Sequence, residues 1–328
     1  MSASADKPAV LGGSPVIERA EWPTWPPRLP EINAALNNVI TNDQWGVGSQ
    51  AVEDFEQAFC GYQEAQYGIA MTNCTVALYA ALAAFDIGPG DEVIIPAYTF
   101  MATAAAIIQV GATPVFADID PLTYNLDPDA TEAAVNSHTR AIIPVHIGGN
   151  PADMEAFKDL AAKYNLALIE DAAQAPGAMY GDRKVGAIGD LGCFSFQSSK
   201  NLTAGEGGIL LTNDEHLYDK IFQVYNCGRT LTGPWYEHVY PGLNFRISAF
   251  QAAVLNAQMP HLEGWVSKRE ENGLYLEGLL NEIEGWRCLG RYAKTGRNAY
   301  HLQISAYNPG SFSGLPKKKF LAALLAEG

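Results

Sequence analysis

The sequence predicts an α/β fold, in which a mostly parallel sheet is flanked by helices and followed by a smaller C-terminal α/β domain. Short apolar segments of strand character recur between residues 92 and 212. Segments of about 10–15 residues with helical character separate them. Strands that are apolar throughout are typical of a parallel sheet covered on both faces. In such a sheet, ligands bind at the carboxyl ends of the strands.

The predicted elements follow one another in chain order. A helix is expected at 50–60 and another at 75–86, which is followed by the stop signals Gly88 and Gly90. The expected strands are 92–96, 113–118, 141–146, 166–171, 191–196 and 207–212, and the helices between them lie near 99–110, 128–136 and 151–164.

The pattern becomes mainly helical after about residue 214. Residues 246–262 are expected to form one helix up to Pro260, and 263–285 a second, longer one. The stretch "WPTWPPRLP" is expected to be an extended arm that docks its tryptophans on a folded body or a partner. The predicted parts are an N-terminal arm (1–30), a large domain (31–262) and a small C-terminal domain (263–328), which we expect to be incomplete.

Composition and charge narrow the classes of function. There are 36 acidic and 21 basic residues, and the formal net charge of −15 argues against binding nucleic acid or anionic membranes. Small anionic ligands need only a local positive pocket. The five cysteines are dispersed and lack C-x-x-C spacing, so neither a disulfide framework nor a metal site is expected. No secretory signal or membrane-spanning run is visible, and a cytoplasmic setting is expected.

Two polar positions stand where ligands are expected. Asp171 closes the apolar segment "LALIED", which places it at the ligand-binding edge of the sheet, although it could instead cap the following turn. Thr72, Asn73 and Thr75 precede a long apolar helix. The first N–H groups of such a helix are unpaired and suit a phosphate, although ordinary capping by Asn73 or Thr75 is the alternative.

Lys200 lies between a strand-like segment and a glycine cluster in "FSFQSSKNLTAGEGG", residues 194–208. A single lysine in a loop is usually a solvated surface charge. The glycines, however, permit a close backbone approach, and a lysine in a partly desolvated cleft has a lowered pKa. Such an amine can form a Schiff base with an aldehyde. Ser195, at the end of the preceding strand, could reach the same phosphate.

Together these residues form the set that pyridoxal 5′-phosphate (PLP) requires. A lysine holds its aldehyde as an imine, and an acid holds the pyridinium proton, which makes the ring an electron sink. The helix start would bind the phosphate. Phe100, which follows the strand at 92–96, is placed to stack on the ring, although core packing is the alternative.

The chain resembles the DegT/StrS-type aminotransferases, PLP-dependent enzymes of fold type I that aminate keto sugars and cyclitols. The resemblance runs from about residue 9 to the end, in the family's order and spacing. The matching blocks are "DIGPGDEVIIPAYTF", "GATPVFADIDPLTYNLDP", "IEDAAQAPGA", "CFSFQSSKNLTAGEGG" and "GLNFRISAFQAAVL".

The resemblance implies a role for each matching residue. Lys200 falls on the family's Schiff-base lysine, Asp171 on the pyridinium partner and Phe100 on the ring-stacking aromatic. The further implied contacts are Ser195 and the backbone at Cys74 and Thr75 with the phosphate, Gln174 near the ring hydroxyl, Asn244 with the phosphate of the neighbouring subunit, and Arg229 near the substrate entrance. The resemblance therefore implies a homodimer with shared active sites.

Two departures from the family pattern are visible. The family usually has Gly-Thr where this chain has Cys74-Thr75, so the Cys74 side chain could crowd the approach of the phosphate. Family members also normally continue past residue 328, so the resemblance implies that the small C-terminal domain is incomplete here.

The resemblance implies transfer of an amino group from glutamate or glutamine to a nucleotide-linked keto sugar or a cyclitol ketone, in amino-sugar, polysaccharide or secondary-metabolite biosynthesis. Lys200 stands where the family's dehydratases have histidine, which favours transamination. Gln197 and "LGGSPV" resemble the cyclitol and aminohydroxybenzoate branches. The alternatives are a PLP-dependent sugar dehydratase, an aminohydroxybenzoate-type synthase, and an inactive PLP-binding regulatory or partner subunit.

Overall fold

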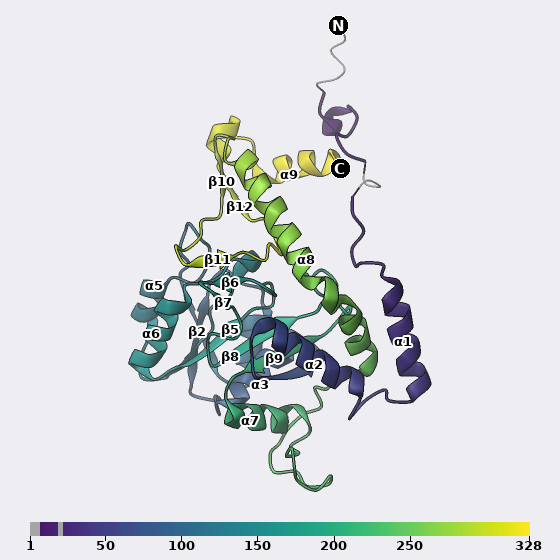
Figure 1. Cartoon of the computed structure of the whole chain (residues 1–328). Coiled ribbons are helices and arrows are strands. Elements are labelled where there is room, and N and C mark those ends of the chain that lie inside the picture. Colours follow the sequence, from purple (N-terminus) through teal and green to yellow (C-terminus); the bar gives the residue numbers. More distant parts are fainter. Residues whose placement is uncertain (1–6, 19–21) are drawn as a thin grey trace. The chain divides into compact units, whose positions relative to one another are not determined.

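A computed structural model of the chain describes residues 7–18 and 22–328 (Figure 1). The chain forms two compact units. The large unit comprises Leu29–Gly273 and Gly290–Gln303, and the described part of the small unit comprises residues 7–18, 22–28, 274–289 and 304–328. The domain boundaries expected from the sequence, at residues 30 and 262, stay predictions.

A seven-stranded sheet with the order β1-β9-β8-β5-β4-β2-β3 lies in the large unit. Strands β2, β3, β4, β5 and β8 pair in parallel, whereas β9 is antiparallel to both of its neighbours. The predicted, mostly parallel sheet is therefore confirmed. The strands are β1 (Tyr67–Met71), β2 (Glu92–Pro96), β3 (Thr113–Ala117), β4 (Thr139–Ile142), β5 (Ala167–Asp171), β8 (Leu191–Ser195) and β9 (Gly208–Thr212).

Helices precede, connect and follow these strands, and two apolar clusters form the core. Successive strand residues point to opposite faces of a sheet. Accordingly, Ile94 belongs to the cluster that contains Phe55 and Phe157, whereas Val93 and Ile95 belong to the cluster that contains the apolar side chains of α3. The helices are α1 (Pro30–Asn42), α2 (Gln50–Gln63), α3 (Cys74–Ala84), α4 (Ala102–Gln109), α5 (Pro128–Ala134), α6 (Met154–Tyr164), α7 (Glu215–Tyr225) and α8 (Ala249–Leu280). Figure 1 shows α5 and α6 side by side.

The prediction of two helices separated at Pro260 is wrong, because α8 continues through this residue as one helix. A proline inside a helix removes one hydrogen bond and crowds the preceding turn. Here Leu255, before the proline, and Leu262 and Val266, after it, are all buried in the same apolar cluster. Packing on both sides of Pro260 thus outweighs the local cost.

Smaller sheets complete both units. In the large unit, β6 (Met179–Tyr180), β7 (Arg183–Lys184) and β11 (Thr295–Arg297) form a three-stranded sheet. In the small unit, β10 (Trp286–Cys288) pairs with β12 (Ser305–Tyr307), and α9 (Lys317–Ala326) packs against the short helix η1 (Ala9–Leu11).

The expected arm belongs to the small unit. The indole Nε1 of Trp22 donates a hydrogen bond of 3.0 Å to the carbonyl of Gly328. Trp22 and Trp25 line a cavity together with Leu325, so both tryptophans lie against the C-terminal helix of their own unit. Within residues 7–18 and 22–328, no helix combines the length and apolar character needed to cross a membrane.

Candidate active site

Asp171 lies at the carboxyl end of β5, as predicted, and is only 5% exposed. Its Oδ2 accepts a hydrogen bond of 2.8 Å from the Thr103 hydroxyl, and its Oδ1 accepts one of 3.2 Å from the N–H of Ala173. Because Asp171 accepts the bond from Ala173, it also caps the turn that follows β5, which was the alternative role. Burial raises the pKa of Asp171 and outweighs these two donors. The carboxyl is thus desolvated and suited to a cationic partner.

Lys200 lies in the loop that joins the antiparallel strands β8 and β9. Its N–H donates to the carbonyl of Gln197 at 2.9 Å, and the next side chain, Asn201, is buried. Burial lowers the pKa of Lys200, and the nearby carboxyl of Asp171 only partly opposes this effect. Lys200 is therefore not a solvated surface charge, and the structure brings it into the electrostatic neighbourhood of Asp171 and Cys74.

The first turn of α3 lies beside this pair. Asn73 caps the helix, because its Oδ1 accepts a hydrogen bond of 3.1 Å from the N–H of Val76. Cys74 and Thr75 are the first two residues of the helix, and N–H groups at these positions have no partner within a helix. They are therefore the donors that this helix start can offer to an anion.

Strand β9 approaches the start of α3 closely at Gly208. A Cβ atom at this position would lie 2.5 Å from the carbonyl carbon of Asn73 and 2.7 Å from the nitrogen of Cys74. In the sheet, Gly208 pairs with Ser195, the buried last residue of β8. The absence of a side chain at Gly208 therefore brings Ser195 and the α3 start to one corner of the site.

The Cys74 thiol is buried in the apolar cluster that contains Cys193. Burial raises its pKa well above the ordinary value, and Asp171 and Cys193 add to this shift. The thiol is therefore uncharged. Whether it crowds a bound phosphate stays a prediction.

Phe100 and Gln174 also lie near Asp171. The ring of Phe100 is 74% exposed, which excludes the alternative that it packs in the core. The Phe100 carbonyl accepts a hydrogen bond of 3.2 Å from the N–H of Thr103, whose hydroxyl binds Asp171. Gln174 is fixed by its Oε1, which accepts a hydrogen bond of 2.7 Å from Gly148.

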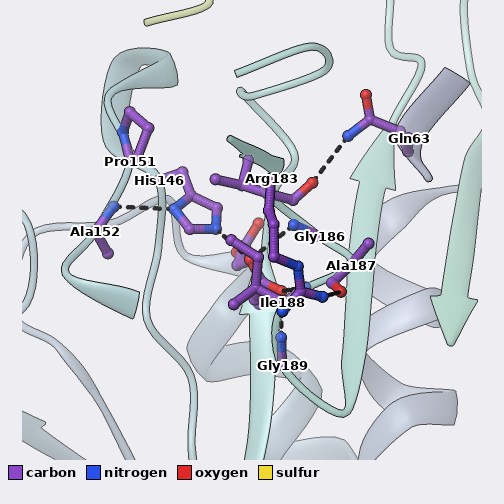
Figure 2. A network of polar contacts seen from close by, with 12 residues as sticks. Gln63, His146, Pro151, Ala152, Arg183, Gly186, Ala187, Ile188 and Gly189 are labelled. Carbon is purple, nitrogen blue, oxygen red and sulfur yellow. Dashed lines mark hydrogen bonds and ion pairs between the residues drawn. The ribbon is translucent and has the colours of Figure 1, made fainter. Parts of the chain in front are cut away.

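A buried polar network that includes His146, Gly186, Ile188 and Gly189 was not predicted from the sequence (Figure 2). Its centre is Glu170, which is 0% exposed. The carboxylate of Glu170 accepts hydrogen bonds from the N–H groups of Gly186 (2.7 Å), Ile188 (2.8 Å) and Gly189 (2.7 Å), and contacts the Nε2 of His146 at 2.9 Å. Burial alone would raise the pKa of Glu170, but these hydrogen bonds lower it below its usual value.

The same network fixes the orientation of the His146 ring. Its Nδ1 accepts a hydrogen bond of 3.0 Å from the N–H of Ala152, so Nε2 is the ring nitrogen that donates to Glu170. The main chain of His146 donates to the carbonyl of Asp171 at 3.1 Å. His146 and Glu170 therefore hold the strand end that presents Asp171.

Arg229 and Asn244 line a cavity of about 820 Å³ in the large unit. Phe245, next to Asn244, accepts a hydrogen bond of 2.9 Å from the N–H of Thr72, so this segment runs beside the chain that leads into α3. The guanidinium of Arg229 stacks 4.1 Å from the ring centre of Trp235. Among the described residues, the lining of this cavity includes neither Lys200 nor Asp171. The structure of one chain thus brings together Lys200, Asp171 and the α3 start, and places Arg229 and Asn244 in a separate cavity.

Comparison with known proteins identifies the family. The model of the DegT/DnrJ/EryC1/StrS aminotransferase family matches residues 28–328. The chain belongs to this family. Among curated relatives, it is 43% identical over 257 residues to a "Pleiotropic regulatory protein" of Geobacillus stearothermophilus, covering 78% of this chain and 68% of that protein.

Two further relatives of this chain are named as aminotransferases. One is the "L-glutamine:2-deoxy-scyllo-inosose aminotransferase" of Streptomyces paromomycinus, which is 36% identical over 334 residues, or 97% of this chain and 78% of the relative. The other is the "UDP-N-acetyl-3-dehydro-alpha-D-glucosamine 3-aminotranferase" of Acidithiobacillus ferrooxidans, which is 42% identical over 256 residues, or 77% of this chain and 68% of the relative.

Solved structures show the same fold. That of 3-amino-5-hydroxybenzoic acid synthase has a TM-score of 0.84 and 37% sequence identity, covering 87% of this chain and 75% of that one. The structure of NtdA from Bacillus subtilis, with bound cofactor PMP, has a TM-score of 0.78 and 28% identity, covering 86% of this chain and 64% of that one. This family member is accordingly a PLP-dependent aminotransferase of fold type I.

The described residues fit PLP. Asp171 is a buried carboxyl, and among the described residues the Thr103 hydroxyl donates a side-chain hydrogen bond to it; a ring N–H⁺ would add a cationic donor. The N–H groups of Cys74 and Thr75 begin α3 and have no partner within the helix, so they suit a phosphate. The half-buried amine of Lys200 lies in the same neighbourhood.

Proposed function

We propose that this aminotransferase transfers an amino group from glutamate or glutamine to a polyhydroxylated ketone, either a nucleotide-linked keto sugar or a cyclitol ketone. The names of the relatives from Streptomyces paromomycinus and Acidithiobacillus ferrooxidans support the two classes of acceptor. The observation that carries the proposal is the desolvated amine of Lys200 beside the buried carboxyl of Asp171.

Lys200 and Asp171 are the proposed catalytic residues. PLP, when bound, supplies an electron sink for the bonds at the amino-bearing carbon. Lys200 Nζ would hold the cofactor and, once displaced, would accept and return a proton; its lowered pKa favours the neutral amine that this requires. The Asp171 carboxylate would hold the proton on the ring nitrogen.

The other residues would bind and orient the cofactor. The N–H groups of Cys74 and Thr75 and the hydroxyl of Ser195 would bind the phosphate. Phe100 would stack on the ring, and Gln174 would lie near the ring hydroxyl. The exposure of the Phe100 ring supports its role, because a core residue could not reach a ligand.

We further propose that the protein is a cytoplasmic homodimer in which Asn244 reaches the phosphate of the neighbouring subunit and Arg229 lies near the substrate entrance. The position of both residues in a cavity that Lys200 does not line supports this assignment. Residues that serve a partner's site need not lie near their own chain's Lys200.

The proposal is tested on the protein loaded with PLP. Mixing with L-glutamate or L-glutamine should replace the visible absorbance band with that of the aminated cofactor and release the 2-oxo acid. Lys200→Ala should lose both the borohydride-reducible band and this half-reaction. A Lys200→Ala protein that keeps the reducible band would refute the assignment.

A regulatory role is the second candidate, because the relative from Geobacillus stearothermophilus is named as a regulatory protein. A synthase or dehydratase is a third, because 3-amino-5-hydroxybenzoic acid synthase has the same fold. Failure of the PLP-loaded dimer to react with any amino donor would favour the regulatory role. Loss of water from a ketone without amino transfer would favour the third candidate.

A further inference from the structure

A segment distant in sequence is bound to the loop that carries Lys200. Asn201, the residue after Lys200, donates from Nδ2 a hydrogen bond of 2.8 Å to the carbonyl of Ala299. Asn201 and Ala299 are both buried. The segment of residues 298–302, "NAYHL", is therefore fixed beside the Lys200 loop in the large unit.

A second loop holds the same segment on the other side of His301. The N–H of Leu302 donates to the carbonyl of Gly148 at 3.1 Å, and the N–H of Ala299 donates to that of Gly149 at 3.0 Å. Gly148 is also the residue whose N–H is bound by the side chain of Gln174. The backbone on both sides of His301 is thus bound to Gly148 and Gly149, and the side chain of Gln174 binds the same segment.

The backbone next to His301 has an unusual conformation. Tyr300 has a φ of +42°, which side chains of its size rarely adopt. The Asn298 side chain accepts a hydrogen bond of 2.8 Å from its N–H, and a Cβ atom at Gly149 would lie 2.9 Å from its nitrogen. Such conformations persist only where the surrounding contacts fix them, and they cluster at functional sites.

The imidazole of His301 lacks one expected interaction. Its Nδ1 is buried and has no hydrogen-bond partner among the described residues. Burial lowers the pKa of His301 to about 3, and the charges of Lys200 and Arg269 add to this shift. His301 is therefore a neutral ring close to Lys200, and a buried polar atom without a partner requires an explanation such as a ligand or a water.

We propose that His301 is a specificity-determining residue that hydrogen-bonds a hydroxyl group of the amino acceptor. The inference rests on the proposed function, because it takes the acceptor to be a polyhydroxylated ketone. A neutral imidazole can donate to and accept from a hydroxyl. It offers no charge to the carboxylates of glutamate, which cationic side chains bind better. His301 should therefore act on the acceptor and leave the amino donor unaffected.

The two half-reactions separate these roles. The aminated enzyme is prepared with the amino donor, and its reoxidation is followed by absorbance with the 2-oxo acid of that donor, with 2-deoxy-scyllo-inosose and with UDP-N-acetyl-3-dehydro-α-D-glucosamine. For His301→Ala we expect kcat/KM to fall about 10–100-fold for the hydroxylated ketone that the parent accepts, the loss expected for a missing hydrogen bond in the site. The reaction with the 2-oxo acid should change by less than about 3-fold, since a neutral imidazole contributes little to binding a carboxylate.

Two variants complete the comparison. His301→Asn, whose amide can replace Nδ1, should recover part of the lost rate with the ketone. His216→Ala, on the exposed face of α7, should leave both half-reactions unchanged. Equal losses with the 2-oxo acid and the ketone in His301→Ala, or no loss with the ketone, would overturn the proposal.

A spectroscopic readout tests the position of His301 without turnover. In His301→Glu, a negative charge beside Lys200 should raise the pKa at which the visible band of the Lys200-bound cofactor titrates by about one unit. Thermal unfolding shows whether the variant is folded. If His301→Glu is folded and the pKa of the visible band does not shift, the placement of His301 beside Lys200 is wrong. If the parent accepts neither ketone, the proposed acceptor is wrong, and the role of His301 in binding its hydroxyl is wrong with it.

Discussion

Two adjacent carboxyl groups at the end of β5 have opposite environments. Glu170 accepts three backbone N–H groups and contacts His146, and these contacts lower its pKa. Asp171 has fewer donors, and burial raises its pKa. Glu170 is thus a fixed anion that holds the strand end, whereas Asp171 is a carboxyl that a cationic ligand can stabilise.

Glu170→Gln should lower the free energy of unfolding by about 2–4 kcal/mol at pH 7, because an amide NH₂ would face N–H donors in a buried site. A carboxyl with a lowered folded-state pKa contributes stability above its unfolded pKa and loses it as the pH falls through the folded pKa. The difference between parent and variant should therefore shrink below about pH 4. Urea unfolding of the parent and of Glu170→Gln, at pH 7 and below about pH 4, measures this difference in the free energy of unfolding.

The exposed Glu155 provides the control, because its ion pair with Lys294 lies at the surface. Exposed pairs contribute little, so Glu155→Gln should change stability by less than about 1 kcal/mol. Equal stability of Glu170→Gln and the parent at pH 7 would contradict the role assigned to Glu170.

Asp171→Asn should separate stability from activity. Because burial raises the pKa of Asp171, its ionisation at pH 7 opposes folding, and a neutral asparagine removes this cost. The cofactor-free variant should therefore unfold at the same or a higher temperature than the parent. Its half-reaction with the amino donor should slow by at least about 100-fold, because a charge aimed at the ring is lost. A large loss of thermal stability would show that Asp171 is mainly structural.

The residue scale also shows what could be predicted from the sequence. Lys200 and Asp171 were predicted because each follows an apolar strand-like segment, where the site of a parallel sheet lies. Glu170 was missed, although a charged residue inside a buried strand indicates that polar partners are buried with it. The position of residues 298–302 beside the Lys200 loop could not be predicted, because it depends on a bond between segments about 100 residues apart.

At the scale of elements, the strand positions were predicted well, but not every direction. Strand β9 is antiparallel to β8, because the loop of residues 196–207 contains no crossover helix and parallel neighbours require one. An apolar pattern does not encode strand direction. Edge strand β1 was missed, and α8 was divided at Pro260 because its packing partners are distant in sequence.

Gly208→Ala should disturb the contact between β9 and α3. The new Cβ would lie 2.5 Å from the backbone of Asn73, so the strand or the helix start must shift. We expect a loss of about 1–3 kcal/mol of stability and weaker PLP binding, measured by titration of the visible band. Gly264→Ala in α8, where the Cβ would meet nothing within 4 Å, should instead be neutral or stabilising by up to about 1 kcal/mol. PLP affinity equal to that of the parent in Gly208→Ala would contradict the phosphate site at this corner.

At the scale of the whole molecule, the proposed site residues of one chain do not gather in one place. Lys200, Asp171 and the start of α3 form one group, and Arg229 and Asn244 line a separate cavity. In the proposed homodimer, a second copy of the chain would supply Asn244 and Arg229 to the site that contains Lys200. The isologous contacts of a twofold dimer would create two such shared sites.

This arrangement predicts complementation between two inactive variants. Lys200→Ala lacks the proposed amine, and Asn244→Glu places a negative charge where the proposed phosphate contact lies. In a heterodimer, one site carries both defects and the other carries neither. Random exchange after mixing equal amounts should thus restore about a quarter of the parent activity, because half of the dimers contain one intact site. To test this, the two variants are co-expressed with different affinity tags, and the half-reaction of the heterodimers is measured. Pure heterodimers without activity would show that Asn244 acts in the site of its own chain, because each of the two sites would then carry one of the two defects.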